Sequence, residues 1–139
     1  MSFRLGIDLV AVEDVEESLH VHAERYLERI YSPRELADCR TASGVIAAER
    51  LAARFAAKEA AIKVLRPGAD TSVPWQAIEV VREDGGGVEL VLSGRAADLA
   101  RTGRLASFAV SLTHEGSYAA AVVLAEAEQP GGGLDNKPG

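Results

Sequence analysis

The order of apolar and polar positions predicts an α+β protein that begins with a strand and two helices. An apolar run from Phe3 to Val12 is typical of a buried strand. Apolar residues then recur at every third or fourth position, which predicts one helix from Glu13 to Ile30. Ser32-Pro33-Arg34-Glu35 combines an N-cap serine, a proline at the first helical position and a glutamate at the third, so a short second helix begins there.

The rest of the pattern predicts a long central helix, a hairpin, a further helix and two more strands. The central helix spans Val45 to Leu65 and ends before Pro67-Gly68. Ser93 caps a helix that ends near Gly103. The expected strands are Ala77–Arg82, Val88–Leu92, Ala106–Thr113 and Tyr118–Glu126. We therefore expect one domain over residues 1–127, and a disordered tail rich in glycine and proline over residues 128–139.

The central helix carries charges on a segment that is otherwise suited to burial. Leu51, Phe55 and Ile62 form an apolar stripe, and alanines beside it allow close approach of other backbone. Arg54 and Lys58 are four residues apart, and like charges at this spacing repel each other. A bound anion would turn this repulsion into a favourable interaction.

Gly6-Ile7-Asp8 places a carboxylate within the first strand. Such a carboxylate is unfavourable unless a cation or hydrogen-bond donors meet it. Together with Glu59, Asp8 suggests a shared divalent metal, and Mg²⁺ fits because it commonly takes one or two protein carboxylates together with water and substrate phosphate. The arginine and lysine residues would then hold the phosphates of a ligand.

Simpler structural roles compete with each of these interpretations. Glu59 and Lys63 could form only an exposed ion pair at helical i,i+4 spacing. Asp8 could cap a turn at the strand end through its own backbone. His114, at the end of a predicted strand, could be a structural histidine.

Three motifs in this order resemble the holo-acyl-carrier-protein synthase family, the small single-domain type of 4′-phosphopantetheinyl transferase. They are Gly6-Ile7-Asp8, the segment Arg54-Phe55-Ala56-Ala57-Lys58-Glu59-Ala60 with Lys63, and Ser111-Leu112-Thr113-His114. The central motif is highly specific, whereas either of the others alone would occur by chance. The resemblance runs from about Phe3 to Glu126 and implies a small antiparallel sheet packed with a long central helix, in a homotrimer with active sites between subunits.

The resemblance also implies a reaction and roles for the motif residues. The phosphopantetheine arm of coenzyme A would pass to a serine of an acyl carrier protein, with release of 3′,5′-ADP. Asp8 and Glu59 would hold Mg²⁺, and Lys63 would contact the pyrophosphate and stabilise or protonate the departing phosphate, so these three are the expected catalytic residues. The serine proton could pass to Asp8, to Glu59 or to a metal-bound water. Arg54, Lys58, Lys63, Thr113 and His114 are the expected coenzyme A-binding residues.

Composition and charge narrow the alternatives without identifying the function. The 139 residues suffice for one core, and 47% hydrophobic with 26% charged residues is ordinary for a soluble globular protein. No apolar run is long enough to span a bilayer, no signal-peptide core is evident, and the lone Cys39 suits a reducing compartment, so we expect a cytoplasmic protein. A net charge of −6 argues against general nucleic-acid binding.

One position departs from the family pattern. The helix after the first strand usually begins with an arginine that grips the acidic recognition helix of the carrier, and this chain has Asp14 there. Because acidic surfaces repel, we hypothesise a less acidic or specialised carrier, such as one of a secondary-metabolite pathway. Arg25 and Arg29 still match family positions and could keep part of the docking surface.

Two other classes of function stay open. The chain could be a non-catalytic relative that binds coenzyme A or only assembles with other proteins, although a module without catalysis has little reason to keep Asp8, Glu59 and Lys63 together. It could also be a nucleotide hydrolase that uses the same phosphate and metal contacts. Such an enzyme would release 3′,5′-ADP without any carrier.

Overall fold

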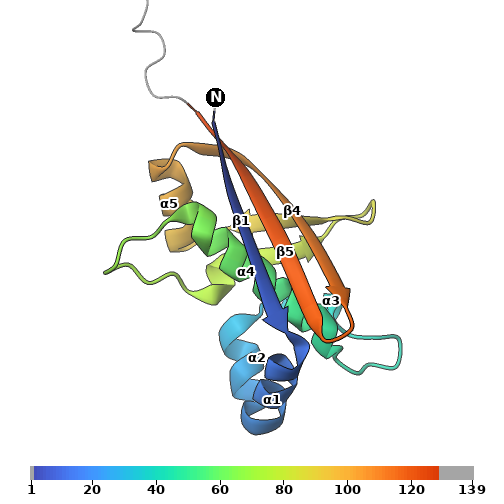
Figure 1. Ribbon diagram of the computed structural model, residues 1–139. Coiled ribbons are helices and arrows are strands. Elements are labelled where there is room, and N and C mark those ends of the chain that lie inside the picture. The colour runs from blue at the N-terminus through green and yellow to red at the C-terminus, as the bar shows by residue number, and fades with distance from the viewer. Residues whose placement is uncertain (1, 129–139) are drawn as a thin grey trace, which may run out of the picture.

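The computed structural model describes residues 2–128, which form an α+β fold (Figure 1). Most predicted elements are present, with ends that differ by a few residues. In chain order they are β1 (Ser2–Ala11), α1 (Val12–His22), α2 (Glu24–Ile30), α3 (Pro33–Asp38), α4 (Ala48–Leu65), the 3-10 turn η1 (Trp75–Ala77), β2 (Ile78–Arg82), β3 (Val88–Leu92), α5 (Gly94–Thr102), β4 (Leu105–Glu115) and β5 (Tyr118–Ala127).

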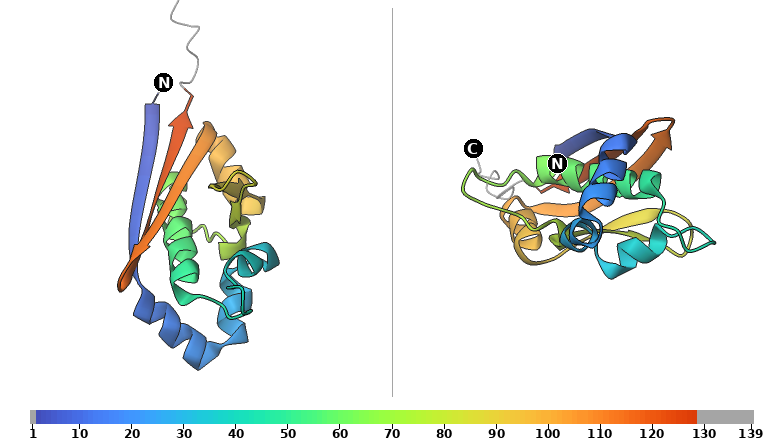
Figure 2. Two further views of the ribbon diagram at one scale, coloured as in Figure 1. Left: turned by 90° about the vertical axis from the view of Figure 1, so that its right-hand side faces the viewer. Right: turned by 90° about the horizontal axis from the view of Figure 1, so that it is seen from below.

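The strands form two small antiparallel sheets, and the second is the predicted hairpin. β1, β5 and β4 lie side by side in that order, and β2 pairs only with β3. Helix α4 packs against one face of the three-stranded sheet, and the β2–β3 hairpin and α5 lie on the other side of α4 (Figure 2). The hairpin contacts α4 through β2, and it contacts the three-stranded sheet directly where β3 lies against β4.

The alanines of α4 make this central position possible. Ala52, Ala56, Ala57, Ala60 and Ala61 are all fully buried, whereas Phe55 and Ile62 of the predicted apolar stripe are only partly buried. Small side chains let strands approach the helix axis closely, so the alanine face packs on the sheet. The sequence correctly predicted this flank as a close-approach surface.

The predicted helix from Glu13 to Ile30 is wrong in one respect, because it breaks at Ala23. Ala23 has φ 43° and ψ −120°, which ends α1 and begins α2 in a new direction. After this break Tyr26, Leu27 and Ile30 pack against the same cluster as Val15 of α1. A straight helix could not bring both segments onto that cluster.

The segment before α4 is a loop, so the helix begins at Ala48 instead of Val45. The N–H of Thr41 donates to the carbonyl of Val45, and the N–H of Ala47 donates to that of Cys39. These bonds hold the chain in a turn up to position 47. The capping box at Ser32 and Glu35, in contrast, is present as predicted and starts α3.

β1 is buried on one face only, which corrects the expectation of a buried strand. Gly6, Asp8 and Val10 face α4, while the apolar side chains of the opposite face are exposed. We call this second surface the outer sheet face, and it comprises Phe3, Leu5, Ile7 and Leu9 of β1, exposed by 59–66%, with Leu124 of β5. It is the side of the sheet that α4 leaves uncovered (Figure 2).

Two sequence expectations concern the ends and surface of the chain. Of the predicted tail, the N–H of Glu128 donates to the carbonyl of Arg104, and residues 129–139 lie outside the described residues. Within residues 2–128, no helix has the length and apolar character needed to cross a membrane.

Candidate active site

Gly6 brings β1 against α4 where the predicted site residues lie. A β-carbon at position 6 would stand 2.2 Å from the carbonyl oxygen of Ala60, so only glycine allows this approach. Asp8 follows two positions later on the same face of β1, and Glu59 and Lys63 flank Ala60 on α4. The glycine thus places the three predicted catalytic residues around one point of contact.

Lys63 bridges the strand and the helix through its ammonium group. Its Nζ donates to the carbonyl of Ile7 at 2.7 Å and lies 3.3 Å from the Asp8 carboxylate. Within residues 2–128, Lys63 forms its ion pair with Asp8 of β1 and not with Glu59, its i,i+4 neighbour on α4. The lysine side chain remains 55% exposed, so a ligand can reach it.

Asp8 and Glu59 line one pocket of about 330 Å³, together with Asp14 and Ser18 of α1. Burial, and then the charge of Asp8, raise the pKa of Glu59, and Lys63 partly opposes the shift. Two carboxylates that repel in this way are relieved by a cation. In residues 2–128 no group of three or more acidic, histidine or cysteine side chains gathers as metal ligands, so this pair is the arrangement that would have to hold a metal.

A second pocket, of about 220 Å³, gathers cations around Arg54. Thr113 and His114 line it as predicted, and Arg50 and Arg82 join them. Arg54 is only 4% exposed, its guanidinium lies 3.8 Å from Asp38, and its buried Nε has no hydrogen-bond partner. A buried donor without a partner costs free energy that an anion in this pocket would recover.

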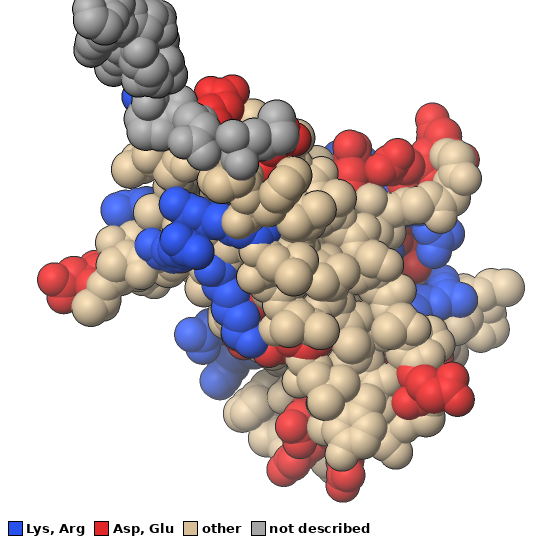
Figure 3. Space-filling model, turned by 45° about the horizontal axis from the view of Figure 1, so that its top comes forward, with Lys and Arg blue, Asp and Glu red and all other residues tan. Residues whose placement is uncertain are grey.

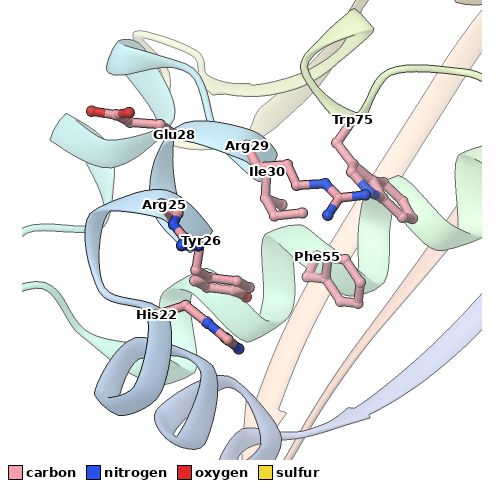
Figure 4. A pocket seen from close by; sticks show the side chains of 8 residues that line it. All are labelled: His22, Arg25, Tyr26, Glu28, Arg29, Ile30, Phe55 and Trp75. Carbon is pink, nitrogen blue, oxygen red and sulfur yellow. The ribbon is translucent and has the colours of Figure 1, made fainter.

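A larger cavity of about 620 Å³ adjoins the carboxylate pocket (Figure 4). Tyr26 and Phe55 line both hollows, so the two are continuous at these rings. Tyr26, Phe55 and Trp75 form its aromatic wall, and the side chain of Arg29 extends toward Trp75 while Glu28 points away. The cavity therefore offers an apolar surface with cations at its rim, beside the carboxylates.

Residues 4–123 match the sequence profile of the 4′-phosphopantetheinyl transferase superfamily. The chain belongs to this superfamily. It is 43% identical over 123 residues to the holo-[acyl-carrier-protein] synthase of Koribacter versatilis, a match that covers 87% of this chain and 95% of that protein. The family predicted from the three motifs is therefore confirmed.

Solved structures of similar proteins share the fold of this transferase. A complex of an ACPS with CoA from Chronobacterium ammoniagenes superposes with a TM-score of 0.80 and 32% identity, and the match covers 93% of this chain and 100% of that one. The Helicobacter pylori holo-[acyl-carrier-protein] synthase in complex with coenzyme A gives a TM-score of 0.75 and 26% identity, over 88% of this chain and 100% of that one.

Lys58 corrects one expectation about the site of this transferase. Its side chain is fully buried and its Nζ has three partners within the chain: Glu35 at 2.8 Å and the carbonyls of Trp75 and Ile78. Burial lowers the pKa of Lys58, and the Glu35 carboxylate counteracts the shift. The Glu35 carboxylate thus compensates the repulsion expected between Arg54 and Lys58. Lys58 is a structural lysine and is not positioned to bind coenzyme A.

Several residues that line these pockets, or hold their neighbours, were not predicted from the sequence. Arg50 lies four residues before Arg54 and therefore on the same helix face, a signal that was available. The pairing of Lys58 with Glu35 was harder to predict, because the sequence already explained Glu35 as part of a capping box. Tyr26 reaches the carboxylate pocket only because α2 turns away at Ala23, and no sequence signal marked that break.

Proposed function

We propose that this protein is a holo-[acyl-carrier-protein] synthase that transfers the 4′-phosphopantetheine group of coenzyme A to a serine of an apo acyl carrier protein and releases 3′,5′-ADP. The observation that carries the proposal is the meeting of Asp8, Glu59 and Lys63 around the Gly6–Ala60 contact. The names and bound ligands of similar proteins support the same reaction.

Asp8 and Glu59 are the residues that would hold Mg²⁺. The fit rests on the raised pKa of Glu59, since the neighbouring Asp8 charge contributes to it and a divalent cation would relieve it. Bound there, Mg²⁺ would neutralise charge on the pyrophosphate of coenzyme A. Two protein carboxylates match the usual share of protein ligands for this ion.

The side chains of this chain supply positioning and charge. Lys63 is oriented by the carbonyl of Ile7 and by Asp8, so its ammonium can donate to the departing phosphate as the bond to the pantetheine phosphate breaks. Arg54 and His114 would hold the nucleotide end, with the planar guanidinium matched to phosphate oxygens. The nucleophile belongs to the carrier, and the serine proton would pass to Asp8, to Glu59 or to a metal-bound water.

We also propose that copies of the chain assemble, as a homotrimer, through the outer sheet face. Four apolar side chains of β1 stand exposed in a row, which is unfavourable for a protein that remains a monomer. A small hollow on this face lies between Ile7, Thr113 and Val122. Thr113, a predicted coenzyme A-binding residue, thus adjoins the proposed contact, in agreement with an active site between subunits. A cytoplasmic location stays a prediction.

The charge near the carboxylate pocket supports a specialised carrier. Asp14 lines this pocket, and Glu13, Glu16 and Glu17 of the same helix are exposed beside it. An acidic carrier helix would meet repulsion here and attraction only near Arg25 and Arg29. Kinetics with a panel of carriers tests this: a standard acidic fatty-acid carrier that proves the best substrate, with no gain from Asp14→Arg, would exclude the hypothesis.

Two measurements separate the proposed transferase from the other classes. A non-catalytic relative would bind coenzyme A without using the metal pair, so we expect Mg²⁺ to tighten coenzyme A binding in the wild type and Glu59→Ala to abolish the tightening. A hydrolase would form 3′,5′-ADP without any carrier, whereas the transferase should form it only when an apo carrier is present. Release without a carrier would overturn the proposed reaction.

A further inference from the structure

Arg66 has an unfavourable backbone conformation at the end of the helix that carries Glu59 and Lys63. It is the C-cap of α4, with φ 53° and ψ 60°, and its N–H donates to the carbonyl of Ile62. This left-handed conformation is where helices usually place glycine, because any side chain makes it less favourable. A residue kept in such a conformation near an active site suggests that its side chain has a use.

The guanidinium of Arg66 is available for a ligand. Arg66 is exposed and lies three residues beyond Lys63, and among residues 2–128 its side chain takes part in no ion pair or hydrogen bond. Lys63, in contrast, already engages Asp8 and the carbonyl of Ile7. The Arg66 guanidinium is therefore more available than the Lys63 ammonium to bind a ligand with two phosphate charges.

A second cation, Arg4, reaches the same end of α4 as Arg66. Arg4 donates from Nη1 to the carbonyl of Val64, and both its terminal nitrogens lie 3.3 Å from the position of a β-carbon on Gly103. Gly103 is the C-cap of α5, so the ends of α4 and α5 meet at Arg4. On one face of the molecule, lysine and arginine side chains form a stripe next to a broad surface without charges (Figure 3).

We propose that Arg66 is a further binding residue of this enzyme and contacts the pyrophosphate of coenzyme A beside Lys63. This inference rests on the proposed function, because it takes coenzyme A as the ligand. The pyrophosphate carries two negative charges, and an arginine fork offers paired donors to phosphate oxygens. The free energy of ligand binding gained through the side chain would thereby offset the folding stability lost through the backbone conformation.

The simpler explanation is that Arg66 only complements the negative end of the α4 dipole. Arg104 offers a matched comparison, because it has φ 56°, also follows the end of a helix, and is exposed. It follows α5, however, and not the helix that carries Glu59 and Lys63. Glycine at either position relieves the same backbone conformation, so only a ligand contact would distinguish the two.

The test compares Arg66→Gly and Arg104→Gly in the full chain. We expect each substitution to raise the melting temperature by about 2–4 °C, since glycine adopts this conformation without a steric penalty. Arg66→Gly should weaken coenzyme A binding in the presence of Mg²⁺ by roughly tenfold, as for loss of a charged hydrogen bond. Arg104→Gly should change it less than about twofold on the same scale, and Arg66→Lys should restore part of the loss.

The choice of ligand locates the contact and separates this inference from the function itself. With 3′-dephospho-coenzyme A the loss caused by Arg66→Gly should be the same, because the pyrophosphate is unchanged. A loss that disappears with this ligand would overturn the assignment to the pyrophosphate. Normal binding by Arg66→Gly, when the wild type binds coenzyme A and transfers its arm, would overturn the inference alone. A wild type that does not bind coenzyme A would overturn the proposed function, and this inference with it.

Discussion

Gly6 and Ala60 touch backbone to backbone, and this contact determines where Asp8 lies relative to Glu59. The carbonyl of Ala60 occupies the space that any other side chain at position 6 would need. The separation of β1 from α4 at this point is therefore set by a missing methyl group. The arrangement of the proposed catalytic carboxylates depends on it.

Gly6→Ala should loosen this contact and impair the site. The added β-carbon must displace backbone, and overpacking of this kind typically costs about 1–3 kcal/mol of stability. We expect lower stability in urea and a weaker effect of Mg²⁺ on coenzyme A binding. Gly85→Ala is the control, because a β-carbon there meets nothing within 4 Å. Equal stability of the two variants would show that the strand and helix are not in contact as described.

Glu59→Gln should stabilise the metal-free protein at neutral pH. Because the pKa of Glu59 is raised in the folded state, the folded protein holds this proton more tightly than the unfolded chain. Stability is then lost as pH rises from the unfolded value, about 4.3, through the folded pKa. Glutamine removes this loss. With a chelator present, the variant should therefore be more stable than the wild type at pH 7, and this difference should disappear near pH 4.

The same variant should lose what Glu59 contributes to function. We expect Glu59→Gln to remove the Mg²⁺ enhancement of coenzyme A binding while the protein itself becomes more stable. Glu89→Gln, at an exposed position on β3, serves as control and should change neither property. A Glu59→Gln protein that is less stable than the wild type at pH 7 would contradict the repulsion between Glu59 and Asp8.

Lys58→Met should destabilise the fold through Glu35. Removing one partner of a buried ion pair leaves the other charge unpaired, which typically costs about 3–5 kcal/mol. The double variant Lys58→Met/Glu35→Gln removes both charges and should lose less than the sum of the single variants in denaturant unfolding. Additive losses would contradict the pairing seen at 2.8 Å.

Leu5→Glu should convert the assembled protein to monomers. Leu5 is 66% exposed in the single chain, so a glutamate there leaves the fold of one copy intact and places a charge within the proposed contact. Light scattering should report a trimer for the wild type and a monomer for the variant, with unchanged circular dichroism. A wild type that is monomeric at micromolar concentration would exclude assembly through the outer sheet face.

Local chemistry made much of the fold predictable. The capping box at Ser32 and Glu35, and the stop at Pro67-Gly68, are interactions between near neighbours and are present at the predicted places. The break at Ala23 was not predictable in this way, because alanine favours helix and only packing against Val15 and its cluster explains the turn. The second sheet likewise depends on tertiary packing, because β3 lies against β4 without hydrogen-bonding to it as a neighbouring strand.

The candidate site shows the same division. Asp8, Glu59 and Lys63 could be predicted from the motifs, because the family resemblance implies that these residues, although distant in sequence, lie in one site. Lys58 was misjudged, since its role depends on Glu35 and on two carbonyls brought close only by the tertiary fold. The strain at Arg66 could not be inferred from sequence, because a backbone angle is visible only in the structure.

The most direct test of the central claim is intact-mass spectrometry of a panel of apo carrier proteins incubated with this protein, coenzyme A and Mg²⁺. We expect at least one carrier to gain the mass of one phosphopantetheine, a chelator to prevent the gain, and Lys63→Ala to slow it greatly. The result that would contradict the claim is a panel of unmodified carriers, acidic and less acidic alike, although the protein binds coenzyme A.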